Sequence, residues 1–326
     1  MITTDNTYDI HNRAQHSQVM NYSDSALTTF TSLQDINYYS YDRYVNVLSQ
    51  TIDSYSTQTV DEANLIDHKV ITNEYSDAVA RRRGNASLTT VVRYTSLAED
   101  PSNEIDKTVT ATTLFDNRGF AVDQVTDSFV YDKTSAKELL STRRLIHNEN
   151  IDNRGDSHSQ TITTLETDPT GLEDTLEVVS YQKLTNRKYD SQHNILNQMI
   201  FTYADKDAEG NGVTLLDVQE VRQTGFHSSG VALKQVIVTY SDASRSEIID
   251  CKVIENSGIS ANGNVGVTTI TRYSLATVVE DGGITPAEGT EIDKQTITTD
   301  SFDVRGNALH QTVIREYYDE GEFKFS

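Results

Sequence analysis

A short pattern that recurs along the whole chain limits the possible folds more than any other feature of the sequence. Its clearest copies begin with FDNRG at residue 115, IDNRG at 151 and FDVRG at 302, and fainter copies bring the number to nine. Aligned on the Gly of Asp-x-x-Gly, the nine copies are centred on Asn12, Val45, Gly84, Gly119, Gly155, His193, Gly230, Gly263 and Gly306. These centres, called origins below, are about 37 residues apart on average, which is typical of repeat architectures.

The Asp and the Gly of this pattern predict a tight turn. The Asp carboxylate can accept backbone N–H groups of the turn, and Gly can adopt the left-handed conformation that closes a hairpin. The best examples are Asp116 with Gly119, Asp152 with Gly155, and Asp303 with Gly306.

The residues that follow each origin predict a strand. The seventh residue after the origin is β-branched in all nine copies, and the tenth is Tyr or Phe in seven. Gln stands two positions before the β-branched residue in six copies, among them Gln124, Gln160, Gln198, Gln235 and Gln311. Residues two apart in a strand share a face. We therefore predict a cross-strand Gln ladder on a buried face, together with Ile162, Ile200, Ile237, Ile270 and Val313.

Each repeat is expected to be a strand, a turn, a second strand and a variable polar loop. We predict an all-β fold without long helices, in which residues 1–326 form a single tandem array of nine β-hairpins and a continuous, twisted or spiralling antiparallel sheet. The hairpins are expected at about residues 2–24, 32–57, 69–96, 105–132, 141–168, 178–205, 216–242, 249–275 and 292–319.

The turn, with an aromatic residue before its Asp, resembles the YD repeats of RHS and teneurin-type proteins. The resemblance covers the whole chain and rests on Tyr8-Asp9, Tyr41-Asp42, Phe115-Asp116 with Gly119, Tyr189-Asp190, and Phe302-Asp303 with Gly306. Serial hairpins of that family coil into a large sheet, so the resemblance implies a coiled sheet and, as one role, a segment of an encapsulating shell. Large repetitive bacterial surface proteins with Asp-x-x-Gly-Asn hairpins are an equally good comparison.

Charge and composition exclude several classes of protein. The chain has 27 Lys and Arg against 49 Asp and Glu, and its net charge of −22 argues against binding to nucleic acid or to an anionic membrane surface. No apolar stretch is long enough to span a membrane. Cys251 is the only cysteine, so no disulfide can form within the chain, and the first residues do not resemble a signal peptide.

One acidic loop has the spacing of a calcium site. In DKDAEG, Asp205, Asp207 and Glu209 alternate ahead of a Gly, as in the calcium loops of EF-hands. A solvated acidic loop is the alternative, because Leu216 stands where an EF-hand has its last Glu and no helix is predicted on either side. Calcium is the one cofactor that the sequence suggests.

A run of three basic residues, Arg81, Arg82 and Arg83, falls in the turn of the third repeat. In so acidic a chain this run indicates a solvated turn or a contact for an acidic neighbour.

No catalytic motif stands out, so we expect a protein that is not an enzyme. The sequence favours a structural protein of the cell surface or extracellular space that builds a fibre, sheath or spacer, because sheet formation explains every repeated column. An adhesin-like module that binds a glycan or a protein through its inter-hairpin loops is the alternative. The outer strands would have free edges, so we expect head-to-tail self-association or continuation into a longer repeat chain.

Overall fold

The computed structural model describes residues 2–22, 26–28, 30–207, 209–260, 262–279, 282–303, 306–319 and 321–325. Nineteen of its strands belong to one antiparallel sheet, and β17 and β18 form a separate two-stranded ribbon. This architecture confirms the predicted all-β fold class.

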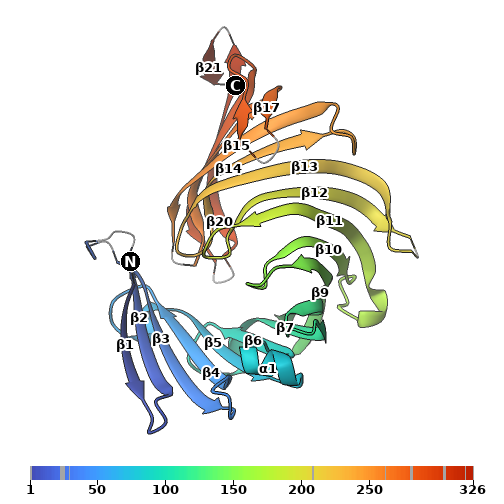
Figure 1. The fold of residues 1–326 in the computed structure, drawn as a ribbon. Helices are drawn as coiled ribbons and strands as arrows, with labels where there is room; N and C mark the ends of the chain where they lie inside the picture. Colours follow the sequence, from blue (N-terminus) through green and yellow to red (C-terminus); the bar gives the residue numbers. More distant parts are fainter. Residues whose placement is uncertain are drawn as a thin grey trace. The chain divides into compact units, whose positions relative to one another are not determined.

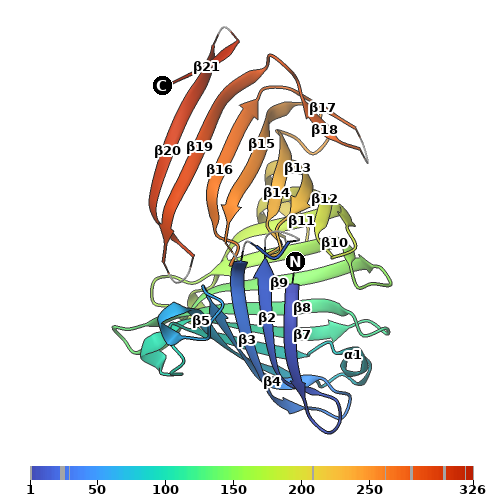
Figure 2. The same ribbon diagram turned by 90° about the vertical axis from the view of Figure 1, so that its left-hand side faces the viewer.

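Nine hairpins account for most of the described residues (Figures 1 and 2). Their strands, in hairpin order, are β1 (Ile2–Tyr8) and β2 (Ala14–Tyr22), β3 (Phe30–Tyr41) and β4 (Val47–Tyr55), β5 (Leu65–Glu74) and β6 (Leu88–Tyr94), β7 (Glu104–Phe115) and β8 (Ala121–Asp132), β9 (Lys137–Ile151) and β10 (Ser157–Glu166), β11 (Glu177–Tyr189) and β12 (Ile195–Lys206), β13 (Gly212–Phe226) and β14 (Ala232–Tyr240), β15 (Ile248–Ile259) and β16 (Val265–Tyr273), and β19 (Glu291–Phe302) and β20 (Ala308–Asp319). A last short strand, β21 (Glu322–Phe325), pairs with β20.

The chain divides into two compact units. Unit 1 comprises residues 1–148 and 162–179, and unit 2 comprises residues 149–161 and 180–326. Strands β9, β10 and β11 contribute residues to both units.

Every origin found in the sequence adopts the left-handed conformation. The backbone φ angle at the nine origins lies between 60° and 95°, even where the residue is Asn12, Val45 or His193 instead of Gly. At each origin the backbone N–H donates to the C=O of the residue three positions earlier, at 2.9–3.4 Å. A positive φ is costly for a β-branched residue such as Val45, so the surrounding hairpin must impose it.

Neighbouring hairpins are joined in one recurring register. The residue four positions after an origin pairs with the residue eight positions before the next origin, as His16 pairs with Asn37 and Asn197 with Arg222. The same offset joins β6 to β7, β8 to β9, β14 to β15, and β16 to β19. In all seven repeats with an aromatic tenth residue, the register shifts immediately before that residue. The aromatic column therefore marks a β-bulge, which bends the strand and increases its twist.

Extra residues enter the repeat at two places. Helix α1 (Ala78–Arg83) fills the turn of the third hairpin; the Asp77 side chain caps its start, and Gly84 ends it in the left-handed conformation. The ribbon of β17 (Ala276–Val278) and β18 (Ile284–Pro286) lies in the chain between β16 and β19. Three loops each contain a single 3₁₀ turn, at Glu62–Asn64, Pro101–Asn103 and Glu173–Thr175.

The prediction about which strand face is buried is wrong for most of the chain. Of the five β-branched residues named above, Ile162 alone is buried; Ile200, Ile237 and Ile270 are half-buried, and Val313 is exposed. In unit 2 the core instead consists of Met199, Val218, Val236, Val238, Tyr240, Cys251 and Ile284. Residues one position apart point to opposite faces, so Val236 and Val238 face the core and Ile237 faces away from it.

Candidate functional site

The turns at the origins are the most regular polar feature of the structure. In five of them the Asp carboxylate accepts the backbone N–H groups of the residues two and four positions later, at 2.7–3.0 Å; these are Asp9, Asp42, Asp116, Asp152 and Asp190. In the Asp303–Gly306 turn, Asp303 accepts the N–H of Asn307 at 2.8 Å, and the two residues between Asp303 and Gly306 lie outside the described residues. Each carboxylate thus points into its own turn.

Hydrogen bonds keep these carboxylates ionised. The backbone and side chain of Arg13 lower the pKa of Asp9 to about 2. Burial acts to raise the pKa of Asp42, but hydrogen bonds from Arg81 and from the turn lower it to about 2.

Side chains link three successive turns of unit 1. Asn46 Nδ2 donates to the C=O of Arg81 at 2.6 Å, and Arg81 Nε donates to the Asp42 carboxylate at 2.7 Å. One turn further along, Asn85 Nδ2 donates to the C=O of Gly119 at 2.7 Å. A Cβ atom added to Gly119 would lie only 2.8 Å from the backbone of Ala80, so these turns are in direct contact.

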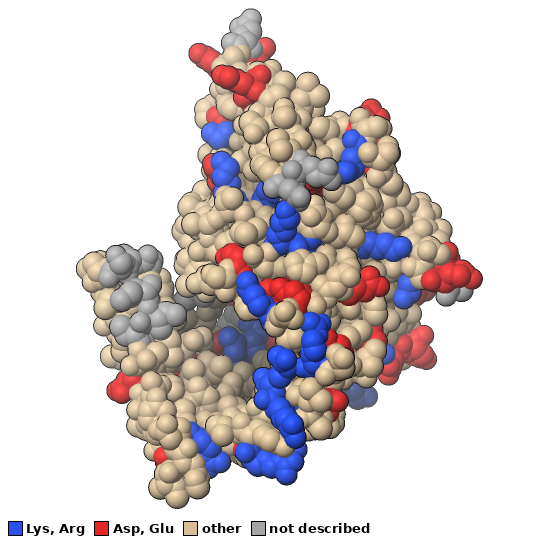
Figure 3. Space-filling view, in the orientation of Figure 1, with Lys and Arg blue, Asp and Glu red and all other residues tan. Residues whose placement is uncertain are grey.

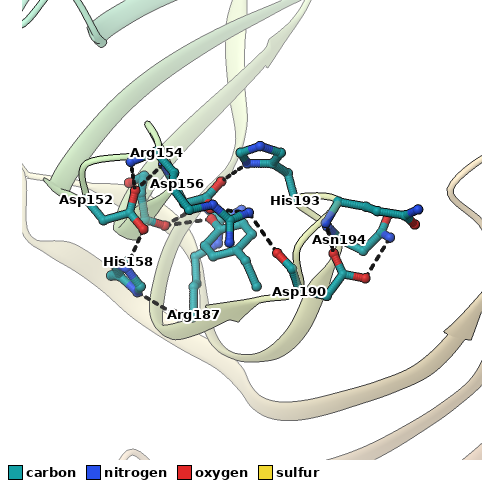
Figure 4. Close-up of polar contacts among 11 residues, drawn as sticks. Asp152, Arg154, Asp156, His158, Arg187, Asp190, His193 and Asn194 are labelled. Carbon is teal, nitrogen blue, oxygen red and sulfur yellow. Dashed lines mark hydrogen bonds and ion pairs between the residues drawn. The ribbon is translucent and has the colours of Figure 1, made fainter.

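A similar link joins two turns of unit 2 (Figure 4). Arg154 donates to the C=O of Asp190 at 2.8 Å and lies 3.2 Å from the carboxylate of Asp156. Asp156, which is buried, lies 2.6 Å from Nδ1 of His193, the origin of the next hairpin. His158, which lies beside the carboxylate of Asp152, contacts the C=O of Arg187 through Nδ1 at 2.7 Å.

Arg187 is a buried cation beside this link. Its guanidinium donates to the C=O of Ser157 at 3.3 Å and lies over the ring of Tyr189, while its Nε has no hydrogen-bond partner. Burial lowers the pKa of Arg187, and the nearby Asp156 opposes this shift. The position is costly, and it is stabilised by the backbone, the ring and a nearby carboxylate instead of by a direct ion pair.

A ladder of charged side chains crosses the strands of unit 1. Asp35 and Asp53 are directly opposite each other on β3 and β4, and both are buried. His16 Nε2 and Gln18 Nε2 contact Asp35 at 2.7 and 2.8 Å, and His68 Nδ1 forms a short contact with Asp53. The hydrogen bond to Asp53 raises the pKa of His68, although burial opposes the shift.

Unit 2 also buries the carboxylate of Glu220. This carboxylate contacts Arg222 at 2.5 Å, the hydroxyl of Tyr240 at 3.3 Å and Arg245 at 3.5 Å. A cavity of about 250 Å³ beside this group is lined by Tyr240, Ser244, Arg245 and Val278. In unit 1 a more apolar cavity of about 340 Å³ lies between strands β8 and β9 and the loop that contains Pro169 and Gly171.

The Gln residues named from the sequence do not form a continuous amide ladder on a buried face. Gln311 is exposed, and the other four are half-buried. Gln124 and Gln311 donate to the hydroxyls of Thr112 and Thr299, at 3.3 and 3.0 Å. Gln235 lies opposite Gln223 in the register of β13 and β14.

The acidic loop named as a calcium candidate forms another turn of the repeat type. Asp205 belongs to β12, whereas Asp207 accepts the N–H of Asn211 at 2.7 Å, and Gly210 has a φ of 81°. Among the described residues no group of three His, Cys, Asp or Glu side chains is placed to hold a metal ion. The geometry therefore gives a structural role to Asp207 and no support to a calcium site made of Asp205, Asp207 and Glu209.

Sequence reasoning missed the links between turns and the charged ladder. The residue after the origin forms the link in three cases, Asn46, Asn85 and Asp156, so its polar character was a usable signal. The ladder depends on the register between hairpins, which a single sequence does not display.

Comparisons with known proteins identify no family. No protein-family model matches the chain, and no curated protein matches it. A matching solved structure is the crystal structure of TcdB2-TccC3, with 9% identity, a TM-score of 0.22, and coverage of 99% of this chain and 23% of that one. A TM-score this low does not establish a common fold. The hairpin-repeat part of the resemblance agrees with the structure, whereas no family model supports the narrower YD-repeat assignment.

Among the described residues, no helix has the length and apolar character needed to cross a membrane.

Proposed function

We propose that this chain is a structural repeat protein without enzymatic activity, which extends by adding strands at the edge of its sheet. The observation that carries this proposal is the free edge of β20. This strand pairs with β19 along one side, but β21 covers only Glu316–Asp319 on the other. A free strand edge is a template for pairing with another chain.

The uncovered part of β20 is also unusually apolar for an edge. Leu309, Val313 and Ile314 are exposed there, with exposed fractions of 67%, 47% and 42%. Natural sheets usually protect such an edge with charges or Pro. The recurring register between hairpins supplies a rule for the added strand, because six junctions between described hairpins share one offset. The junction of β4 with β5 differs, since Ser49 pairs with Thr72, four residues further from the next origin. The added strand belongs to a second copy or to a continuation of the chain, in a fibre, a sheath or a shell segment.

An extracellular or surface location goes with this proposal, because fibres and sheaths of this kind act outside the cell. Cell fractionation with an antibody against the chain tests it, and recovery only from the cytoplasmic fraction would contradict it.

Electron microscopy and sedimentation velocity test the extension. Leu309→Lys with Val313→Lys should abolish association that wild-type protein shows, because two charges would be placed on the free edge. Leu233→Lys with Ile292→Lys is the matched control, since both residues are exposed but lie on strands that are paired on both sides, β14 and β19. A wild-type protein that stays monomeric at all concentrations would contradict extension by a second copy and leave continuation of the chain, and an edge variant that associates normally would contradict the role of the β20 edge.

A binding module is the second candidate, and the apolar cavity beside Pro169 and Gly171 favours it, because loops on a rigid scaffold often carry recognition. A glycan array and a screen of small apolar ligands test it. Filling the cavity with Ser141→Phe should abolish any binding found.

A further inference from the structure

The two ends of the strands of unit 1 differ in charge. The turn side of unit 1 is defined here as the turns at Asp42–Val45 and Asp116–Gly119 together with α1, and the loop side as residues 56–64, 95–103 and 167–175. An antiparallel hairpin places its turn at one end of its strands and its connecting loops at the other. The two sides are therefore opposite edges of the same unit.

The turn side exposes positive charge. Arg43, Arg82 and Arg83 are exposed, and none of the ion pairs found among the described residues includes them. Figure 3 shows Lys and Arg side chains gathered over and around α1. The Asp residues of these turns do not cancel this charge at the surface, because their carboxylates point inward; the side chain of Asp42 is only 1% exposed.

Aromatic rings hold the arginines in place. Arg43 and Arg81 lie over the ring of Tyr44, at 4.8 and 5.5 Å from its centre. Arg83 and Arg118 lie over the ring of Phe120 in the same way, at 4.6 and 5.2 Å. A hydrogen bond from Arg82 lowers the pKa of Tyr44, with a further contribution from the charge of Arg43. Stacked guanidinium groups lose less side-chain entropy when they bind an anion.

The loop side is acidic. Its three loops contain seven Asp and Glu residues and no Lys or Arg: Asp61, Glu62, Glu99, Asp100, Asp168, Glu173 and Asp174. All seven are exposed. Hydrogen bonds from Ser102 lower the pKa of Asp100, and hydrogen bonds from Thr170 lower that of Asp168, so these carboxylates stay ionised. Glu173 contacts Arg143 at 2.5 Å.

The two sides also share a spacing. Successive hairpins contribute one turn to one side and one loop to the other, and each hairpin spans two strands of about 4.8 Å, or roughly 10 Å. The turns and the loops therefore repeat at the same interval along the sheet, although the loop after β8, with Lys133 and Lys137 in or next to it, interrupts the series of acidic loops. A turn side stacked on the loop side of another molecule can match several charges at once.

We propose that the turn side of unit 1 binds the acidic loop side of unit 1 in a second copy of this chain. The contact pairs Arg43, Arg82 and Arg83 of one copy with Glu62, Asp174 and their neighbours of the other. It is a lateral contact, made through the ends of the strands, whereas the proposed extension uses the backbone edge of β20. The two modes together would give a sheath instead of a single filament. This inference deepens the proposed assembly, but it does not depend on β20.

A charge-swap experiment tests the contact by sedimentation velocity at low ionic strength. The turn variant is Arg43→Glu with Arg82→Glu, and the loop variant is Glu62→Lys with Asp174→Lys. These four side chains are exposed and cap no turn, so circular dichroism should show unchanged folding. Each variant alone should associate at least about tenfold more weakly than wild type, which corresponds to about 1.4 kcal/mol, and an equimolar mixture should regain heteromeric association.

The matched control is Lys133→Glu with Lys137→Glu. It changes the net charge by the same amount as the turn variant, but both residues lie in or next to the loop after β8, at the loop end of the strands. It should associate at least as strongly as wild type. Normal association of the turn variant, or a mixture that associates no better than its components, would overturn the proposal.

Two further measurements distinguish the lateral contact from extension at β20 and from binding to an anionic glycan. The Leu309→Lys with Val313→Lys variant should keep the lateral contact and lose only extension, so loss of both in this variant overturns the lateral contact as a separate interface. Binding of wild-type monomer to heparin, with no self-association that depends on Arg43 and Arg82, would overturn the second copy as the partner and assign the surface to an anionic glycan.

Discussion

Unit 1 and unit 2 are built from the same repeat, yet they bury different kinds of side chain at the same repeat position. Asp53 and Val238 both stand eight residues after an origin, and both are buried, with exposed fractions of 7% and 0%. In unit 2 the Val238 side is covered by an apolar cluster that includes Ile284 of the β17–β18 ribbon, with Ala276 and Val278 packed against it. In unit 1 the corresponding position belongs to the ladder of Asp35, Asp53 and His68.

The repeat therefore determines the turns and the register, but it does not determine which side chains occupy the two faces of a strand. Turn geometry depends on Asp and on the left-handed origin, which recur in both units. What is buried depends on what covers the strand. An apolar face needs an apolar cover, whereas a charged face needs a partner for every charge.

The largest expected effect comes from giving unit 2 the residue of unit 1. Val238→Asp would bury a carboxylate among Val218, Val236 and Cys251, directly opposite the buried carboxylate of Glu220. We expect a loss of at least about 4 kcal/mol in the free energy of unfolding, since a second buried charge would face a like charge. Chemical denaturation followed by circular dichroism measures it.

The matched control is Ile237→Asp, one residue away on the opposite, half-buried face. It should cost about 1 kcal/mol, from lost strand propensity and partial burial. Equal costs for the two variants would show that the faces do not differ as described.

The next effect comes from breaking the ladder of unit 1. Asp53→Ala leaves His68 buried without its carboxylate and should cost about 3 kcal/mol. Removal of the Asp35–Asp53 repulsion offsets part of this cost, because the two carboxylates are directly opposite. In the double variant Asp53→Leu with His68→Leu, no unpaired charge remains at this pair. Its cost should therefore be smaller than that of Asp53→Ala, and a larger cost would contradict the assignment.

A smaller effect on stability is expected when a packed turn is compared with an open one. Gly119→Ala and Gly230→Ala both place a Cβ at a φ above 80°, which costs about 1 kcal/mol. The Cβ at Gly119 also meets the Ala80 backbone at 2.8 Å, whereas nothing lies within 4 Å at Gly230. Thermal unfolding should show roughly twice the cost for Gly119→Ala. Equal costs would mean that the turns of unit 1 are not in close contact.

Sequence reasoning recovered what is local and missed what depends on pairing. All nine origins were found, because a left-handed turn needs a few residues in a fixed order, and even Val45 and His193 were located by spacing. The buried face was assigned wrongly because alternation says which residues share a face, not which face is covered. Ile237 belongs to the position that is β-branched in every repeat, but Val238 lies on the face that the apolar cluster covers. Asp207 was named as a calcium candidate, with a solvated acidic loop as the alternative, because turns and ion-binding loops use the same Asp and Gly residues.

The smallest expected effect is a pH dependence of the charged ladder in unit 1. The hydrogen bond to Asp53 raises the pKa of His68 above its ordinary value of 6.5, so the folded state holds this proton more tightly than the unfolded state. The resulting stability is fully present below pH 6.5 and is lost as the pH rises through the raised value.

Raising the pH from 6 to 8 should therefore destabilise unit 1 through His68 and leave unit 2 unchanged by this route. Hydrogen exchange of the β4–β5 and β14–β15 amides, corrected for the intrinsic pH dependence of exchange, separates the two units. In His68→Leu the decline in protection at β4–β5 should disappear, because the titrating group is gone. A decline of equal size at β14–β15, or one that persists in His68→Leu, would show that the charged ladder does not distinguish the units.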